Sequence, residues 1–189
     1  DKTTLQLQTQ RLLLRPMTRE DVPVMFEVTQ NNTELVKYML WEPHKTIEDA
    51  SQTFDNLDPK NIDLVAFHDG QFIGKMVIRD IIYHRHRADL STADLGFWIA
   101  PKHQRQGFMT EALKEICRFC FEDLKLRRLT CGALTENIAS QRVQEKIGFR
   151  KVGVEKKKFL IDGQYHDEYC YEILAEYFFE EKCFELNRF

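Results

Sequence analysis

Residues 94–113 read DLGFWIAPKHQRQGFMTEAL, and this stretch organises the rest of the chain. Residues 94–100 form an apolar and aromatic run that is typical of a strand, and Pro101 ends it. After a polar turn, residues 109–124 place apolar side chains at helical spacing. The stretch therefore predicts a strand, a turn and a helix. The turn carries amide and basic side chains directly before a single glycine: Gln104, Arg105, Gln106 and Gly107.

The predicted turn has the groups that an anion requires. A helix N-terminus presents unpaired backbone N–H groups and the positive end of the helix dipole, and together these bind phosphate. Gly107 allows a close approach of the backbone, Arg105 adds a fixed positive charge, and Thr110 can bond a phosphate oxygen or cap the helix. An ordinary polar surface turn is the alternative, and one glycine does not decide between the two.

The composition is that of a soluble globular protein. The 189 residues are 43% hydrophobic and 30% charged, which suits one domain, residues 1–189, with a sizeable core. No apolar run approaches the roughly 20 residues that cross a bilayer, and the first residues lack the layout of a signal peptide. The net charge of −3 gives no reason to expect nucleic acid. We therefore expect a cytoplasmic protein with neither a membrane nor a nucleic acid partner.

The five cysteines lie in strongly patterned segments, and their odd number favours reduced thiols over a disulfide framework. Cys117 and Cys120 form a C-x-x-C, a spacing found in redox pairs and in half of a zinc site. The sequence has no second C-x-x-C and no H-x3-H to complete a zinc site. Both cysteines lie on the apolar side of the predicted helix, so we expect them to pack in the core, and we expect no metal.

The remaining pattern predicts a mixed α/β domain. Asp-Gly pairs at 69–70 and 162–163 indicate hairpin turns. No G-x-G-x-x-G follows a strand, and Gly107 is not followed by Gly-Lys-Ser/Thr, so neither a Rossmann nor a P-loop site is indicated. Further strands are expected at residues 12–14, 62–67, 72–78, 129–134, 151–161 and 166–174. Further helices are expected at residues 22–28, 33–38, 46–57, 138–147 and 175–186.

Two blocks of the sequence resemble a known family. The stretch quoted above, together with TENIASQRVQEKIGF at 135–149, resembles the GNAT (Gcn5-related) family of acyl-CoA-dependent N-acetyltransferases. RLLLRPMTREDV at 11–22 and FLIDGQYHDEYCYEIL at 159–174 extend the likeness over almost the whole chain. These blocks look like the RimJ/RimL-type branch, which acetylates the N-termini of ribosomal proteins. The chain departs from the family's phosphate turn at Met109, where the family has Gly or Ala.

The resemblance implies a GNAT fold, in which a twisted, mostly antiparallel sheet of about seven strands splays in the middle and is flanked by helices. It also implies acetyl-CoA as co-substrate. The pantetheine would lie in the split and pair with the strand residues Phe97, Trp98 and Ile99. The pyrophosphate would lie on the turn, which comprises Gln104, Arg105, Gln106, Gly107, Phe108, Met109 and Thr110.

Asn137 and Ser140 have two interpretations that can hold together. From the sequence alone, Asn137 is a plausible N-cap and Ser140 a first-turn residue. The resemblance implies that Asn137 bonds the pantetheine and that Ser140 protonates the departing thiolate. For the general base we favour Asp94, at the start of the strand, although a solvated strand-end carboxylate is the alternative. Some members of the branch carry a glutamate where this chain has Lys158, so that base does not carry over.

The acceptor would be met by side chains of the N-terminal helices and the last hairpin. The candidates are Tyr38, Trp41, Tyr165, His166 and Asp167, and a purely structural role is the alternative for each. The HRHR at 84–87 could bind an anion or form a solvated loop.

The sequence thus predicts an N-acetyltransferase. Acetyl would pass from acetyl-CoA to a primary amine, above all a protein N-terminus, by direct attack in a ternary complex. A small amine such as a polyamine, amino acid or aminoglycoside is the first alternative. A CoA-binding module without turnover is the second, and Met109 and Lys158 are the features that favour it. A homodimer is compatible with the resemblance.

Overall fold

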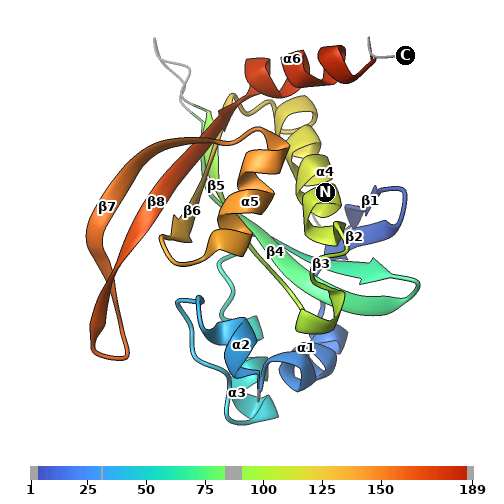
Figure 1. Cartoon of the computed structure of the whole chain (residues 1–189). Helices are drawn as coiled ribbons and strands as arrows, with labels where there is room; N and C mark the ends of the chain where they lie inside the picture. The colour runs from blue at the N-terminus through green and yellow to red at the C-terminus, as the bar shows by residue number, and fades with distance from the viewer. Residues whose placement is uncertain (1–3, 31, 84–90, 187–189) are drawn as a thin grey trace. The chain divides into compact units, whose positions relative to one another are not determined.

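The computed structural model describes residues 4–30, 32–83 and 91–186, and its strands form one eight-stranded sheet in the order β1-β2-β3-β4-β5-β6-β8-β7 (Figure 1). The strands are β1 (Leu7–Gln8), β2 (Leu12–Pro16), β3 (Ile62–His68), β4 (Gln71–Ile82), β5 (Thr92–Ile99), β6 (Arg128–Leu134), β7 (Arg150–Ile161) and β8 (Gln164–Leu174). The helices are α1 (Val22–Thr29), α2 (Thr33–Val36), α3 (Ile47–Asp55), α4 (Phe108–Glu122), α5 (Ile138–Ile147) and α6 (Ala175–Leu186). Two short 3-10 turns, η2 (Arg19–Asp21) and η3 (Pro101–His103), precede α1 and α4.

The chain divides into two compact units that exchange segments. The first unit is Asp1–Ile78 with Phe97–Ala112, and the second is Arg79–Gly96 with Leu113–Phe189. The strand β5 and the helix α4 therefore each run from one unit into the other.

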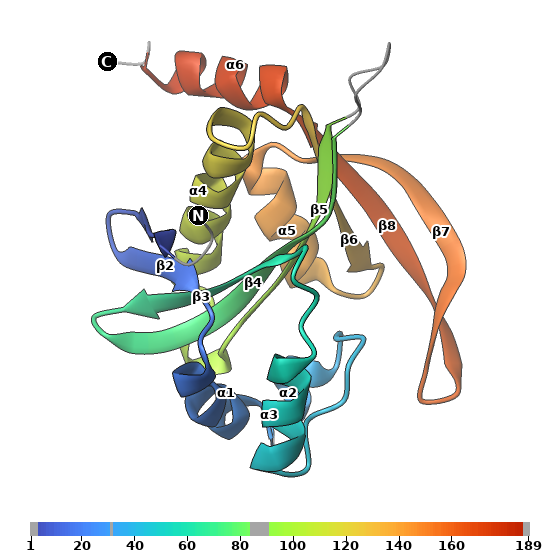
Figure 2. The ribbon, with the colours of Figure 1, turned by 180° about the vertical axis from the view of Figure 1, so that it is seen from behind.

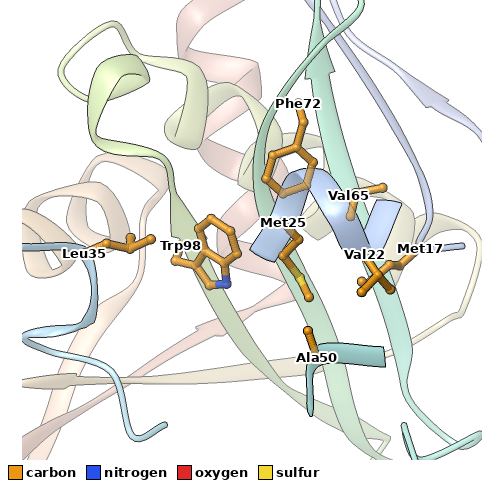
Figure 3. Close-up of a cluster of buried hydrophobic side chains, with 8 residues drawn as sticks. All are labelled: Met17, Val22, Met25, Leu35, Ala50, Val65, Phe72 and Trp98. Atoms are coloured by element: carbon orange, nitrogen blue, oxygen red, sulfur yellow. The ribbon is translucent and has the colours of Figure 1, made fainter. Parts of the chain in front are cut away.

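The first unit holds a core beneath the helices α1 to α3. Short sequence signals place these helices: Thr46 and Asp49 form a capping box at α3, because each side chain bonds the other residue's backbone N–H. The core residues are Met17, Val22, Met25, Leu35, Ala50, Val65, Phe72 and Trp98. Figure 3 shows the helix residue Met25 in one cluster with the strand residues Phe72 and Trp98, so helix and strand side chains close this core together.

The second unit is built on β6, β8 and the long β7–β8 hairpin, which Figure 2 shows from behind. The strands β5 and β6 are parallel and pair from Thr92↔Arg128 to Leu95↔Cys131. The buried side of α4 includes Cys117 and Cys120, and burial raises the pKa of Cys120 to about 12. Both side chains are fully buried, so the prediction that this C-x-x-C packs in the core is confirmed.

The predicted α/β class, mostly antiparallel sheet and element order are confirmed. Both Asp-Gly pairs form hairpin turns, with positive φ at Asp69, Gly70, Asp162 and Gly163. The prediction of about seven strands was one too few, because β1 has two residues and leaves no periodic pattern to detect. The strand β4 is also five residues longer than expected, with one more residue at its start and four more at its end. The HRHR at 84–87 lies outside the described residues.

Among the helices of the described residues, none combines the length and the apolar character that crossing a membrane requires.

Gly74 is expected to be essential for the approach of β4 to β5. A Cβ at this position would collide with the backbone carbonyl of Trp98 and lie 2.9 Å from the Cα of Ile99. We expect Gly74→Ala to lower the free energy of unfolding by about 1–3 kcal/mol, because backbone atoms cannot rotate away. Gly153→Ala is the matched control, since a Cβ there meets nothing within 4 Å. Equal denaturation midpoints for the two variants would contradict this account.

Candidate functional site

The turn between β5 and α4 is held in shape by its own side chains. Gln104 Nε2 donates to the carbonyl of Ile99 over 3.3 Å, and Gln106 Nε2 donates to the carbonyl of Lys102 over 3.0 Å. Arg105 and Gly107 have φ values of 60° and 80°, in the left-handed region. Both amides are thus engaged within the protein: Gln104 ties the turn to the end of β5, and Gln106 ties it to η3.

An ion pair from the N-terminal strands closes the other side of the turn. Arg11 Nε donates to Glu111 Oε2 over 2.7 Å, and Arg11 Nη1 donates to the carbonyl of Gln106 over 3.1 Å. Thr9 Oγ1 and the backbone N–H of Arg11 both donate to Glu111 Oε1, over 2.6 and 2.8 Å. Burial alone would raise the pKa of Glu111, but these hydrogen bonds lower it below its usual value. The carboxylate in the first turn of α4 is therefore charged and fully compensated.

The side chains that follow the glycine point into the protein. Phe108 is buried against the guanidinium of Arg11, 4.4 Å from the ring centroid, and the ring of His68, 4.5 Å away. Met109 is also buried, so its bulk is taken up inside the fold. Any ligand contact at these two positions would come from their backbone N–H groups.

The turn can bind an anion because positive groups remain available there. The first N–H groups of a helix have no intrahelical acceptor, and those of α4 follow Gly107 directly. Arg105 is exposed, and it forms no ion pair with any residue that the structure describes. With Glu111 neutralised by Arg11, the local charge is positive, as a diphosphate requires.

The end of β5 is fixed from one side. Trp98 is 8% exposed and packs against Phe72 and Trp41, with ring centroids 5.9 and 6.2 Å away. Phe97 and Ile99, which alternate with it, are half-buried. Within the first unit the structure thus brings Trp41, the end of β5 and the glycine turn together. Tyr38, also half-buried, contacts the ammonium of Lys37.

In the second unit, Asp94 forms an ion pair with Arg79. Arg79 donates to Asp94 Oδ2 through Nε and Nη2, both over 2.8 Å, and Thr130 Oγ1 donates to Oδ1 over 2.9 Å. At the next residue of β5, the thiol of Cys131 donates to the carbonyl of Leu95 over 3.1 Å, at the last paired position of β5 and β6.

Asn137 and Ser140 lie together at the start of α5. Asn137 Oδ1 accepts a hydrogen bond from the backbone N–H of Ser140 over 3.1 Å, so the predicted N-cap is confirmed. Ser140 Oγ accepts from Gln144 Nε2 over 3.2 Å. The same nitrogen donates to the carbonyl of Gly132 on β6 over 3.3 Å. The hydroxyl of Ser140 is thereby tied to the strand through Gln144.

The β7–β8 hairpin carries a dense charge network. Lys158 pairs with Glu155 and Glu168, and Lys156 pairs with Asp167 over 2.8 Å. Burial alone would lower the pKa of Lys158, but its two carboxylate partners raise it to about 12, so it stays charged at neutral pH. The Glu168 carboxylate lies directly on Gly132, where a Cβ would overlap it.

The three acceptor candidates on this hairpin differ in character. Tyr165 is 63% exposed, whereas Asp167 is held by Lys156 and by the backbone N–H of Lys157. His166 Nδ1 lies 3.4 Å from a carboxylate oxygen of Glu136.

Sequence reasoning overlooked the long-range partners. Arg11 and Glu111 are 100 residues apart, and no local pattern links them. Gln144 gave a weak signal that could have been used, because it follows Ser140 by one helical turn on a face that also carries the buried Ile147.

Comparison with known proteins decides the family. A family model described as "Acetyltransferase (GNAT) domain" matches residues 11–150. The chain belongs to the GNAT acetyltransferase family. This agrees with the resemblance drawn from residues 94–113 and 135–149, and members of the family use acetyl-CoA as the acetyl donor.

Two curated relatives span most of the chain. The uncharacterized N-acetyltransferase YoaA of Bacillus subtilis is 30% identical over 171 residues, which are 89% of this chain and 96% of that protein. The [Ribosomal protein uS5]-alanine N-acetyltransferase of Escherichia coli is 25% identical over 178 residues, which are 86% of this chain and 87% of that protein.

Solved structures agree with the fold. The GNAT-family acetyltransferase of Bacillus anthracis has a TM-score of 0.76 at 28% identity, with 91% of this chain and 99% of that chain covered. A spermidine N-acetyltransferase of Vibrio cholerae, solved with CoA and spermine, has a TM-score of 0.78 at 24% identity, with 90% and 99% covered.

The Glu111 network is expected to make stability depend on pH. Because the pKa of Glu111 is lowered in the folded state, its stabilisation is present above the ordinary carboxyl pKa and is lost as the pH falls through the folded value. Glu111→Gln should lower the free energy of unfolding at pH 7 by about 1 kcal/mol, and the difference from the wild type should shrink toward pH 3. Urea titrations across this pH range would measure it. Glu122→Gln, at the exposed end of the same helix, is the control, and an equal effect of both variants would argue against the network.

Proposed function

We propose that the chain, acting as one domain over residues 1–189, transfers acetyl from acetyl-CoA to the primary amine of a protein N-terminus, as RimJ/RimL-type enzymes do. The observation that carries the proposal is the positive turn before α4, where Arg11 neutralises Glu111 and leaves the helix N-terminus and Arg105 available for a diphosphate.

Each part of the co-substrate has a proposed place. The pyrophosphate binds the backbone N–H groups of residues 107–110 and the side chain of Arg105, while Gln104 and Gln106 shape the turn. The pantetheine pairs with the backbone of Phe97, Trp98 and Ile99, and Asn137 offers it a further hydrogen bond. Trp98 contributes only its backbone, because its ring is in the core.

The reaction requires modest acid–base chemistry. A protein α-amino group has a pKa of about 7.7–8.0, so an appreciable neutral fraction is available at pH 7. Its nitrogen attacks the thioester carbonyl and forms the new C–N bond, and the C–S bond then breaks with its electron pair on sulfur. Ser140 gives its hydroxyl proton to that sulfur and recovers one from solvent. A base passes the nitrogen's proton to solvent, so one proton moves from nitrogen to sulfur overall.

Asp94 remains our proposed base, acting through water. Its pairing with Arg79 and Thr130 fixes its position but also engages both of its oxygens. Proton collection should therefore matter less than alignment of the amine with the thioester.

For the acceptor we propose contacts with Tyr38, Trp41, Tyr165 and Asp167. A small amine such as a polyamine is the second candidate, favoured by the hairpin carboxylates Glu155 and Glu168. These already pair with the alkylammonium group of Lys158 and have the chemistry to hold another.

An acceptor screen tests the proposed function. Thiol release from acetyl-CoA should be measured with peptides that differ in their first residue, with the same peptides blocked at the N-terminus, and with spermidine and free amino acids. We expect release with unblocked peptides only. Thiol release with spermidine alone would show that the acceptor is a polyamine and not a protein N-terminus. Binding of acetyl-CoA without thiol release for any amine would show that the chain is a CoA-binding module.

Arg105 is expected to contribute to acetyl-CoA binding rather than to chemistry. Arg105→Ala should raise the KM for acetyl-CoA about five- to tenfold, the effect of losing one charge-assisted contact to phosphate, and leave kcat nearly unchanged. Lys146→Ala, which removes an exposed charge from the end of α5, is the control. If Arg105→Ala left the KM for acetyl-CoA unchanged, the side chain of Arg105 would not contribute to acetyl-CoA binding.

A further inference from the structure

Gln144 is a buried amide whose position packing does not explain. It is 1% exposed, and its Nε2 donates both to Ser140 Oγ and to the carbonyl of Gly132. Its Oε1 is buried without a hydrogen-bond partner among the described residues. Burying an unpaired carbonyl oxygen costs free energy, so a leucine of similar size would fill the same space with less penalty.

The chemistry of the partners fixes the direction of both hydrogen bonds. The carbonyl of Gly132 can only accept, so the nitrogen of the Gln144 amide must face it. The second N–H of that nitrogen then points at Ser140 Oγ, which must accept. A helical serine often donates its hydroxyl to the carbonyl one turn earlier, but no such bond is present at Ser140 in the described structure. The hydroxyl hydrogen of Ser140 therefore has no acceptor among the described residues.

We propose that Gln144 is a positioning residue that holds Ser140 as an acceptor, so that the Ser140 O–H is free to donate to the sulfur of the departing thiolate. The inference rests on the role of Ser140 in the proposed function. It adds a residue that does not touch the reacting atoms and acts on them through Ser140. Accepting a hydrogen bond also polarises the hydroxyl and makes it a better donor. The bond to Gly132 anchors the amide to β6, so the direction of the hydroxyl is set by the sheet.

The chain offers a matched control in Gln141. This side chain is also buried on α5, and its Nε2 donates to the carbonyls of Leu134 and Thr135 over 3.2 and 3.0 Å. Gln141→Leu and Gln144→Leu therefore remove the same kind of tether between α5 and the end of β6. Only the second removes a hydrogen bond to Ser140.

The experiment compares kcat and the KM for acetyl-CoA, from thiol release with the best acceptor of the screen, and thermal midpoints for the same variants. Gln144→Leu should lower kcat about tenfold with KM within about twofold of the wild type, because the hydroxyl loses its fixed direction at the leaving group. Gln144→Glu should also lower kcat, since a glutamate at this position has no pair of N–H groups and cannot donate both to Gly132 and to Ser140 Oγ. Gln141→Leu should lower the thermal midpoint while keeping kcat near the wild-type value.

A double-mutant cycle separates positioning from structure. In a Ser140→Ala background, Gln144→Leu should cause no further loss of kcat. Equal kcat values for Gln144→Leu and Gln141→Leu, or additive losses in the cycle, would overturn the inference while thiol release by the wild type still supports the proposed function. No thiol release by the wild type with any acceptor would overturn the proposed function and this inference together. Should Gln144→Glu not fold, the leucine variants and the cycle decide.

Discussion

The charge compensation of Glu111 by Arg11 is the constraint on which the candidate site depends. A carboxylate in the first turn of α4 stabilises the helix but would repel a phosphate group. That charge is compensated by hydrogen bonds from the guanidinium of Arg11, the hydroxyl of Thr9 and a backbone N–H. The same guanidinium also donates to the carbonyl of Gln106. One arginine from the edge of the sheet thus sets both the charge and the shape of the turn.

The second unit holds the proposed leaving-group residue, Ser140, in a comparable way. Asn137 caps α5 and so fixes the first turn in which Ser140 lies. Gln144, one turn later, ties the Ser140 hydroxyl to the backbone of β6. In both units, the candidate site residues lie at the start of a helix, and a hydrogen-bonded side chain orients them: Arg11 at α4 and Gln144 at α5. Such fixed orientations suit a transfer reaction that depends on the alignment of the reactants more than on strong acids or bases.

Sequence alone could predict what is local. The Asp-Gly turns and the helical stripe of α4 depend on residues a few positions apart, and both were predicted. The two-residue β1 and the pair of Arg11 with Glu111 depend on chain segments that meet only after folding. One of the two partners of Lys158 was hidden for the same reason, because Glu168 faces it from the next strand. Family resemblance supplied the candidate residues but not the hydrogen bonds that orient them.

The most direct measurement is a calorimetric titration of the purified protein with CoA and with acetyl-pantetheine, which lacks the diphosphate and the nucleotide. If the turn before α4 holds a diphosphate, CoA should bind with one-to-one stoichiometry, its affinity should fall as salt is added, and acetyl-pantetheine should bind far more weakly. Equal affinities for the two compounds, or no heat of binding with CoA, would contradict the account.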